Sequence, residues 1–370
     1  MIGRTNSFSR RLLAWYDRSR RDLPWRVSPG SPLHHRLDPY HVLVSEAMLQ
    51  QTQVATVIPY FQRFLQKFPT VADLAAADEQ DVLRAWQGLG YYSRARHLRA
   101  AAQVIVSQHG GRVPATVEAL RALPGVGAYT AGAVASIAYN CRAPIVDGNV
   151  ARVLCRIDRI ETDPRDTTTL AILWRRAEEI LPHARVGDFN SSLMELGAMV
   201  CTPRAPQCLV CPIRAHCEAV SAGVQDRIPA PRKTKATPLL HRDVLCVRSR
   251  RDGGAGDDVI WLIEQRPASG RWAGMWQFVT VARNGKPPTA KDVAKQTGLV
   301  VEKPKLIGAA CHALTHRRYA FEIYVCTARA DYDRYEPWQS RPRKWVTRAE
   351  LERYPLPRPH AKIARMLDAL

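Results

Sequence analysis

Apolar residues recur every three to four positions through the first half of the chain. This period is typical of helices with one buried face, and it predicts helices from residue 1 to about residue 181. The pair Asp38-Pro39 predicts a helix start, and the apolar positions after it predict one helix that continues to Ile58. The run of residues 128–138 predicts another helix. The first half is therefore expected to be helical throughout.

The pattern changes in the last third of the chain, where short apolar runs rich in β-branched residues predict strands. These runs cover residues 244–247, 259–263, 276–281, 306–312 and 319–326, and helical patterns lie at 290–296 and 358–370. Between the two halves the periodicity is lost around the basic, proline-broken segment 228–235. We predict a mainly helical domain over residues 1–220, a linker over 221–240 and a separate α+β domain over 241–370.

The charge of the chain is unusual. Lys and Arg number 54 against 34 Asp and Glu, which gives a formal net charge of +20. Such a field favours a polyanionic partner, and nucleic acid is the first candidate. An acidic membrane surface is the alternative, but no basic amphipathic helix with an aromatic face is found. No apolar run approaches the about 20 residues of a membrane span.

Glu46 lies on or beside an apolar helical stripe, because Val42, Leu43 and Leu49 are its helical neighbours. A carboxylate there is either paired with a cation or has its pKa raised by desolvation. A salt-bridged core glutamate and a catalytic acid are both consistent with this spacing. The polar segment Gln50-Gln51-Thr52-Gln53 follows at once, which is unusual for a buried helix.

The segment Leu123-Pro124-Gly125-Val126-Gly127 predicts a tight hairpin between two helices, because glycines permit backbone conformations closed to other residues. Unpaired amides at the start of the following helix are suited to a phosphate oxygen. An ordinary helix connection is the alternative. Asp147 lies in a turn before another apolar-periodic run. An N-cap is its simplest interpretation.

The segment Gly88-Leu89-Gly90-Tyr91-Tyr92 joins a helix end to a helix start. Adjacent tyrosines beside glycine and arginine suit a loop that stacks on bases and holds phosphates. They suit a small aromatic core nearly as well.

Four cysteines are spaced C-x6-C-x2-C-x5-C, at Cys201, Cys208, Cys211 and Cys217. Cysteines crowded into a short polar segment, with no signal peptide before them, are typical metal ligands. Four thiolates suit a structural zinc ion and an iron–sulfur cluster equally. The spacing leaves both open.

These motifs occur together and in one order with Ser45-Glu46-Ala47-Met48-Leu49-Gln50-Gln51-Thr52 and Val146-Asp147-Gly148-Asn149-Val150. In this the chain resembles the adenine DNA glycosylases of the MutY family, within the helix-hairpin-helix superfamily. The resemblance implies a mainly α N-terminal helix-hairpin-helix glycosylase domain followed by an α+β Nudix-like domain. It implies a [4Fe–4S] cluster on the four cysteines, and removal of adenine mispaired with 8-oxoguanine or guanine.

The second half strengthens the resemblance. Ile263-Glu264-Gln265-Arg266-Pro267 and Gly270-Arg271-Trp272-Ala273-Gly274-Met275-Trp276 resemble the Nudix-like domain that this family uses to recognise 8-oxoguanine. Leu314-Thr315-His316 stands where the family carries a Phe-Ser-His loop, so a hydroxyl and an imidazole are retained. No Glu-rich hydrolase motif is present, which argues against pyrophosphatase chemistry. Ser191 replaces the Glu or Gln that often follows Phe-Asn in the family, and is left out of the catalytic set.

The resemblance also implies roles for individual residues. Glu46 would protonate the adenine, Asp147 would stabilise the cationic sugar, and Tyr129 and Asn149 would orient them. Tyr129 stands where endonuclease III-type enzymes place a lysine, and a tyrosine cannot form their Schiff base, so a monofunctional enzyme is expected. The expected DNA contacts are Gln50, Gln51, Thr52, Leu89, Tyr91, Gly125, Gly127, Thr315 and His316.

The expected partner is double-stranded DNA containing A:8-oxoguanine or A:G mispairs, bound by a monomer. No targeting signal is recognised, so we expect a cytoplasmic, nucleoid-associated protein with no membrane partner. Two other functions remain open at this stage. One is an endonuclease III-like glycosylase and lyase for oxidised pyrimidines, and the other is an iron–sulfur DNA-binding protein without catalysis.

Overall fold

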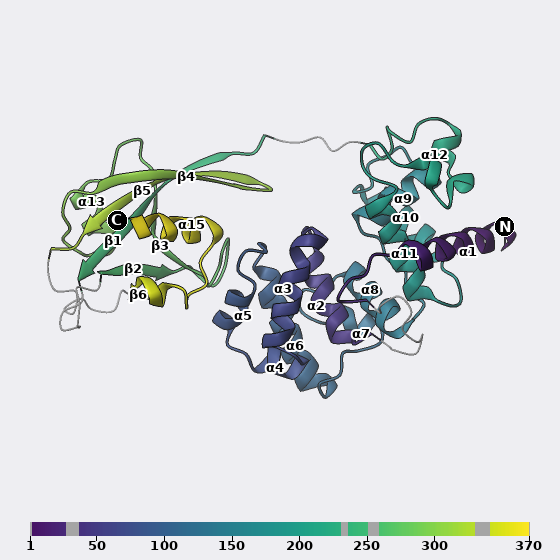
Figure 1. Ribbon diagram of the computed structural model, residues 1–370, viewed down its shortest axis with the longest axis horizontal. Coiled ribbons are helices and arrows are strands. Elements are labelled where there is room, and N and C mark those ends of the chain that lie inside the picture. The colour runs from purple at the N-terminus through teal and green to yellow at the C-terminus, as the bar shows by residue number, and fades with distance from the viewer. Residues whose placement is uncertain (1, 27–36, 231–235, 251–258, 330–340, 370) are drawn as a thin grey trace. The chain divides into compact units, whose positions relative to one another are not determined.

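Two compact units make up the computed structural model, which describes residues 2–26, 37–230, 236–250, 259–329 and 341–369 (Figure 1). Unit 1 comprises Met1–Ala77 and His97–Thr234, and unit 2 comprises Asp78–Arg96 and Lys235–Leu370. Residues 231–235 of the predicted linker lie outside the described residues. The predicted boundaries at 220 and 240 stay a prediction.

Unit 1 is helical, as predicted. Its α-helices are α1 (Ile2–Ser19), α2 (Pro39–Leu49), α3 (Val54–Lys67), α4 (Val71–Ala76), α6 (Ser93–His109, beginning within unit 2), α7 (Val117–Arg121), α8 (Ala128–Tyr139), α9 (Gly148–Ile157), α10 (Thr167–Glu179), α11 (Val186–Met199) and α12 (Glu218–Ser221). Short 3-10 helices at Cys208–Val210 and Arg214–His216 carry the cysteine segment. Helices α7 and α8 with the turn between them form the expected helix-hairpin-helix.

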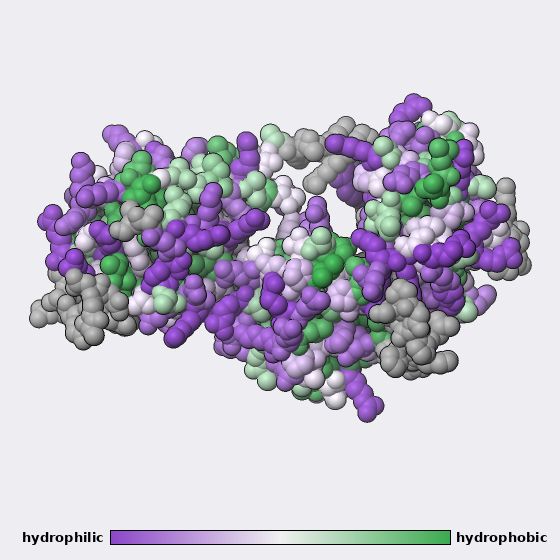
Figure 2. Space-filling model, in the orientation of Figure 1, coloured by the Kyte–Doolittle hydropathy of each residue, from purple (hydrophilic) through white to green (hydrophobic). Residues whose placement is uncertain are grey.

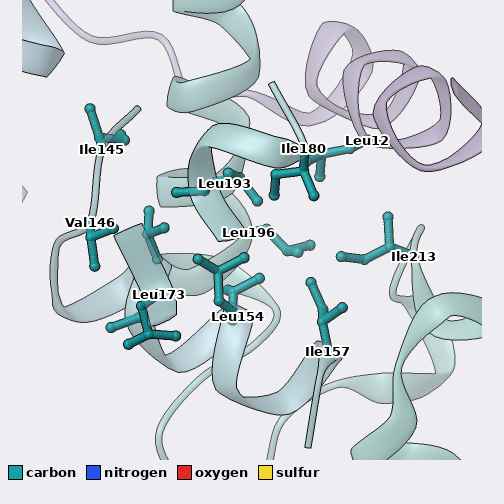
Figure 3. Close-up of a cluster of buried hydrophobic side chains, with 14 of the residues drawn as sticks. Leu12, Ile145, Val146, Leu154, Ile157, Leu173, Ile180, Leu193, Leu196 and Ile213 are labelled. Atoms are coloured by element: carbon teal, nitrogen blue, oxygen red, sulfur yellow. The ribbon is translucent and has the colours of Figure 1, made fainter. Parts of the chain in front are cut away.

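A core of aliphatic side chains fixes the position of α9. Leu154 and Ile157 of α9 pack in one cluster with Leu193 and Leu196 of α11 and Leu173 of α10 (Figure 3). Burying each such side chain contributes about 1.5–3 kcal/mol. The start of α9, where Asp147 lies, is thereby held in place by the core beneath it.

The prediction of one helix from Pro39 through Ile58 is wrong. Helix α2 ends at Leu49 and α3 begins at Val54. Gln51 has a left-handed backbone with φ 57°, which breaks the helical hydrogen-bond ladder. The apolar periodicity continues across the break because both helices present apolar faces to the interior. The periodicity alone therefore does not show where α2 ends.

Unit 2 contains a mixed sheet of six strands in its described part, in the order β4-β5-β1-β3-β2-β6. The strands are β1 (Leu239–Arg250), β2 (Val259–Gln265), β3 (Trp276–Ala282), β4 (Lys305–Leu314), β5 (Arg317–Thr327) and β6 (Arg343–Thr347), and the α-helices are α5 (Glu79–Ala85), α13 (Ala290–Thr297), α14 (Arg348–Leu351) and α15 (Arg358–Met366). The five predicted strands are confirmed. Strand β6 was not predicted, since its five residues bury only Val346 and show no clear alternation.

Helices cover both faces of this sheet. Ile363 of α15 and Leu351 of α14 belong to the cluster on one face, and Val293 of α13 belongs to the cluster on the other. Strands β1 and β5 are parallel, and the other paired neighbours are antiparallel. This architecture agrees with the expected α+β, Nudix-like domain.

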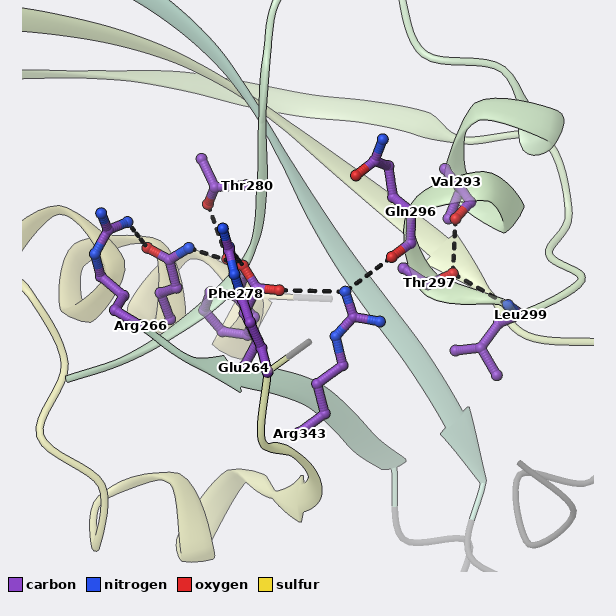
Figure 4. Close-up of polar contacts among 11 residues, drawn as sticks. Glu264, Arg266, Phe278, Thr280, Val293, Gln296, Thr297, Leu299 and Arg343 are labelled. Carbon is purple, nitrogen blue, oxygen red and sulfur yellow. Dashed lines mark hydrogen bonds and ion pairs between the residues drawn. The ribbon is translucent and has the colours of Figure 1, made fainter. Parts of the chain in front are cut away.

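Glu264 anchors a buried polar network in unit 2 (Figure 4). Gln277 Nε2 donates to its Oε1 at 2.9 Å, and Arg343 donates to its Oε2 at 3.3 Å. Arg266 in turn donates to Gln277 Oε1 at 2.8 Å. Because these donors and Arg341 neutralise the carboxylate, we assign this network a structural role.

Hydrophilic residues predominate among the coloured residues on the face drawn in Figure 2. Within the described ranges, no helix has both the length and the apolar character that a membrane crossing requires.

Candidate active site

Glu46 is a buried carboxyl on α2. Its side chain is 5% exposed, and its Oε2 makes no hydrogen bond with any residue that the structure describes. The pKa of Glu46 is raised to about 7, chiefly by burial and also by the charge of Asp147, against the opposing effects of a hydrogen bond with Tyr129 and the charge of Arg26. The alternative of a salt-bridged core glutamate does not agree with this Oε2, which has no partner among the described residues.

Asp147 is the N-cap of α9, as its simplest interpretation predicts. Its Oδ1 accepts from the Val150 amide at 2.7 Å, and its Oδ2 accepts from Asn149 Nδ2 at 3.1 Å. Burial raises the pKa of Asp147, while these hydrogen bonds and the charge of Arg152 oppose the rise. The cap therefore orients a carboxylate that is partly buried and held by two donors.

Glu46 and Asp147 line one cavity of about 550 Å³ in unit 1. The predicted residues that the fold brings together around it are Glu46, Gln50, Gln51, Thr52, Tyr129, Asp147 and Asn149. Burial raises the pKa of both carboxyls, but the hydrogen bonds that Asp147 accepts favour its ionised form, so the pair can present an acid and an anion to one ligand.

Tyr129 and Asn149 connect this pair to the cavity wall. The Tyr129 hydroxyl lies 3.1 Å from Met194 Sδ and is also within hydrogen-bonding reach of Glu46. One hydroxyl proton can serve only one acceptor, and an ionised carboxylate is a better acceptor than a thioether. Asn149 Oδ1 accepts from Arg152 at 2.8 Å, which fixes its amide to donate to Asp147.

The sequence did not identify several residues of the cavity wall. Ser191, Met194, Glu195, Arg21 and Arg26 all line it. Glu195 Oε1 accepts from Arg21 Nε at 2.8 Å, and its Oε2 accepts from Arg26 at 3.0 Å. No spacing signal links these residues, because they come from opposite ends of unit 1. Of these residues only Ser191, which follows Phe189-Asn190, was noted in the sequence, and it was left out of the catalytic set.

We predict that Glu195→Gln destabilises the protein by about 3 kcal/mol at pH 7, because the fully buried Glu195 side chain is the anion of Arg26 and of the partly exposed Arg21. Burial alone would raise the pKa of Glu195, but the hydrogen bonds from Arg21 and Arg26 outweigh it and lower the pKa to about 2. This stabilisation is present above pH about 4.5 and is lost as the pH falls toward 2. Urea unfolding at pH 7 and pH 3 measures it. The difference in free energy of unfolding between the variant and the wild type should be smaller at pH 3 than at pH 7.

Glu178→Gln is the matched control, because Glu178 faces Arg142 at 3.9 Å with 62% of its side chain exposed. Its effect should stay within about 0.5 kcal/mol. Equal losses for both variants would contradict the role of Glu195.

The predicted hairpin contacts lie on the surface of unit 1. Gly125 and Gly127 are exposed in the turn before α8. Gly125 has φ 74°, and an added Cβ would lie 2.4 Å from His97 Cβ, so a side chain is excluded there. Gly127 is the N-cap of α8. The exposed turn leaves the first amides of α8 accessible to a phosphate.

The other predicted contacts line a cavity of about 510 Å³ in unit 2, formed with the two-residue turn between β4 and β5. They are Leu89, Tyr91, Thr315 and His316. The hydroxyls of Tyr91 and Thr315 lie 2.5 Å apart. The loop of adjacent tyrosines is thereby joined to the Leu-Thr-His turn.

The four cysteines of the C-x6-C-x2-C-x5-C spacing lie close enough to interact. The pKa of Cys211 is raised to about 11, chiefly by burial and also by the charges of the other three thiols, against the opposing effect of a hydrogen bond from the Ile213 amide. Buried Arg156 donates to Cys201 Sγ at 3.3 Å and to the Thr202 carbonyl at 2.7 Å. The cysteine segment therefore lies against a buried guanidinium group.

Comparison with known proteins adds to this geometry. Residues 44–179 match the HhH-GPD superfamily of base excision DNA repair proteins, and residues 255–366 match the NUDIX domain. The rat adenine DNA glycosylase is 39% identical over 369 residues, which cover 87% of this chain and 71% of that protein. The chain belongs to the adenine DNA glycosylases.

Other similarities agree with this family. The adenine DNA glycosylase of Mycolicibacterium smegmatis is 46% identical over 213 residues, covering 57% of this chain and 69% of that protein. The solved structure of a thermostable thymine-DNA glycosylase superposes with a TM-score of 0.52 at 30% identity, and covers 60% of this chain and 98% of that one. The chain is thus an enzyme of base excision repair that hydrolyses N-glycosyl bonds.

Proposed function

We propose that this adenine DNA glycosylase removes adenine mispaired with 8-oxoguanine or guanine in double-stranded DNA, without cutting the strand. The observation that carries the proposal is the unpartnered, buried Oε2 of Glu46, which faces a cavity shared with Asp147. An acid and an anion in one enclosed site are what cleavage of a purine N-glycosyl bond requires.

Glu46 is the proposed acid. Adenine leaves poorly as an anion, so a ring nitrogen must be protonated as the bond to the sugar breaks. A carboxyl with a pKa of about 7 is substantially protonated at neutral pH and still releases its proton readily. After the bond breaks, the ionised Glu46 can accept a proton from the attacking water.

Asp147 is the proposed anion. Departure of the base leaves a cationic, oxocarbenium-like sugar, which a carboxylate stabilises or captures in a transient covalent bond. The Val150 amide and the Asn149 side chain hold both oxygens of Asp147. We assign Tyr129 and Asn149 the role of orienting the carboxyl groups and the water.

The target base must leave the helical stack before it reaches this cavity. Gln51 and Tyr91 are our candidates for entering the stack. Both have left-handed backbones, with φ 57° and 46°, a conformation that non-glycine residues hold at a cost and that is concentrated at functional sites. The exposed Gly125 and Gly127 turn would hold a phosphate of the same strand.

The cavity of unit 2 supports recognition of the base opposite the adenine. Leu89 and Tyr91 provide apolar and stacking surface, and Thr315 and His316 provide hydrogen-bonding groups. A hydroxyl and an imidazole are suited to the extra carbonyl and N–H of 8-oxoguanine.

Tyr129 supports a monofunctional enzyme. It lies in the cavity wall beside Glu46. A lyase needs an amine at this place to form a Schiff base with the sugar, and a phenol cannot form one. An endonuclease III-like lyase is therefore not favoured by the site.

The four cysteines fit a [4Fe–4S] cluster. The charges of the other three thiols act on Cys211, so the four sulfurs lie near one another. Four thiolates are the ligand set that such a cluster takes. When bound, the cluster would cross-link residues 201–217.

We predict that the purified protein contains about four iron atoms per chain and no stoichiometric zinc. Cys211→Ala should lower the iron content and the melting temperature, because a ligand of the cross-link is lost. Elemental analysis and visible absorbance measure this. Cys246→Ala, in the buried core of unit 2, should keep its iron. A zinc-containing, iron-free protein would contradict the prediction.

Single-turnover excision on a panel of duplexes tests the proposed function. Adenine opposite 8-oxoguanine or guanine should be released, and adenine opposite thymine should not. Thymine opposite guanine is included because a thymine-DNA glycosylase is among the similar structures. Strand cleavage should require added alkali. Preferred release of thymine, or strand cleavage by the enzyme itself, would overturn the proposal.

A further inference from the structure

Three arginines line the cavity of unit 2. Arg96, Arg271 and Arg317 line it together with His316, and no acidic residue lies among its fifteen lining residues. The proposed recognition of the base uses the hydroxyls of Tyr91 and Thr315 and does not require three guanidinium groups.

The three arginines have different partners. Arg96 donates to the Ala273 carbonyl at 2.6 Å, so it joins the two walls of the cavity. Arg271 lies over the Tyr319 ring, with its Cζ 5.4 Å from the centroid, and donates to the Tyr319 hydroxyl. Arg317 begins β5 and pairs with Leu314 across the turn that carries Thr315 and His316. Arg271 and Arg317 therefore flank the base-reading turn.

The charges around Arg271 are of one sign. Burial lowers the pKa of Arg271, and the charges of Arg317 and Arg242 lower it further. Both neighbours repel Arg271, and the fold holds the group in place through Tyr319. Clustered guanidinium groups of this kind become favourable when an anion is bound between them.

We propose that Arg271 and Arg317 bind a phosphodiester of the DNA strand opposite the adenine, next to the nucleotide that the unit 2 cavity receives. This inference rests on the proposed function and deepens it. A guanidinium matches two phosphate oxygens in a bidentate contact, and Arg271 keeps donors for that contact beyond the one used on Tyr319. Base contacts then specify the nucleotide, and phosphate contacts set its position.

The first experiment measures the affinity for a duplex in which a non-hydrolysable adenosine analogue faces 8-oxoguanine, as a function of salt. Arg271→Gln and Arg317→Gln should each weaken binding about five- to tenfold at 0.1 M salt and lower the slope of log K against log salt by about 0.9. Arg271→Lys should retain the slope. Melting temperatures confirm that each variant is folded.

Arg318→Gln is the matched control. It removes the same charge one residue away, on the alternate face of β5, and Arg318 does not line the cavity. Its salt slope should equal that of the wild type. Equal changes for Arg318→Gln and Arg271→Gln would overturn the proposal, because they would reduce it to a general effect of net charge.

The second experiment identifies the phosphate. Neutral methylphosphonates replace single phosphates around 8-oxoguanine, in combination with Arg271→Gln. At the contacted phosphate the two changes should be non-additive, so that the variant loses no further affinity, whereas at distant phosphates they should add. Additive losses at every position would overturn the proposal.

Titration with free 8-oxo-dGMP tests whether the arginines bind the phosphate of a free nucleotide rather than a phosphodiester of DNA. No Arg271-dependent binding is expected at millimolar concentration. Tight, Arg271-dependent binding of the free nucleotide would overturn the assignment to DNA. A failure of the proposed function would show instead as absent adenine excision by the wild-type protein, which these binding measurements do not require.

Discussion

Glu46→Gln should lower the single-turnover rate of adenine excision by about 10²–10⁴-fold, the usual contribution of a general acid. The amide is similar in size to the carboxyl and fills the same buried position on α2, but it cannot donate an acidic proton to a ring nitrogen. Binding of the mispaired duplex should remain close to that of the wild type. Rapid-quench kinetics and fluorescence anisotropy measure the two quantities separately.

The pH profile of the wild type provides a second test of Glu46. Because its pKa is raised to about 7 and the protonated form is the active one, the excision rate should fall as the pH rises above about 7. It should also fall at low pH, where Asp147 becomes protonated. Glu46→Gln should lose the high-pH limb.

The contribution of Glu46 to the free energy of unfolding should depend on pH in the opposite direction from that of a carboxylate in an ordinary salt bridge. A folded-state pKa raised from 4.5 to about 7 means that the neutral carboxyl is favoured, so its contribution is present below pH 4.5 and is lost as the pH rises through 7. Glu46→Gln has no ionisable carboxyl at this position, so its free energy of unfolding should not fall in this way as the pH rises. The variant should gain stability relative to the wild type between pH 5 and pH 8, by at most about 3 kcal/mol. Retained excision, or a flat difference in stability, would remove Glu46 from its proposed role.

Asp147→Asn should lower the rate of adenine excision by about 10²–10³-fold while leaving the fold intact. Asparagine is as good an N-cap as aspartate, so the amide of Val150 keeps its acceptor and α9 keeps its start. What is lost is the negative charge that would stabilise the cationic sugar. Excision kinetics and thermal unfolding, measured side by side, separate the two roles of this residue.

Asp78→Asn is the matched control for the capping role. Asp78 caps α5 by accepting from the Gln80 amide at 2.7 Å, as Asp147 caps α9, but it does not line the cavity of unit 1. Its excision rate should match that of the wild type. If Asp147→Asn also proved fully active, Asp147 would be an N-cap and nothing more.

Local patterns in the sequence predicted the elements that depend on neighbouring residues. Helix α8, the glycine turn before it and the N-cap at Asp147 each follow from a few consecutive residues, and the structure confirms them. The same holds for five strands of the sheet, whose apolar runs are long enough to recognise. Helix α2 was extended too far, because the left-handed Gln51 has no signature in hydrophobic periodicity.

The sequence alone also determined which residue types are available for chemistry: a carboxyl among leucines, a second at a helix start, and four cysteines at ligand spacing. Only the tertiary structure decided that Glu46 and Asp147 face one cavity, and that Glu195 neutralises Arg21 and Arg26 in its wall. The physical reason is that burial and electrostatic interaction depend on distance in space. Residues far apart in the chain acquire a shared site, and a shifted pKa, only when the core packs their helices together.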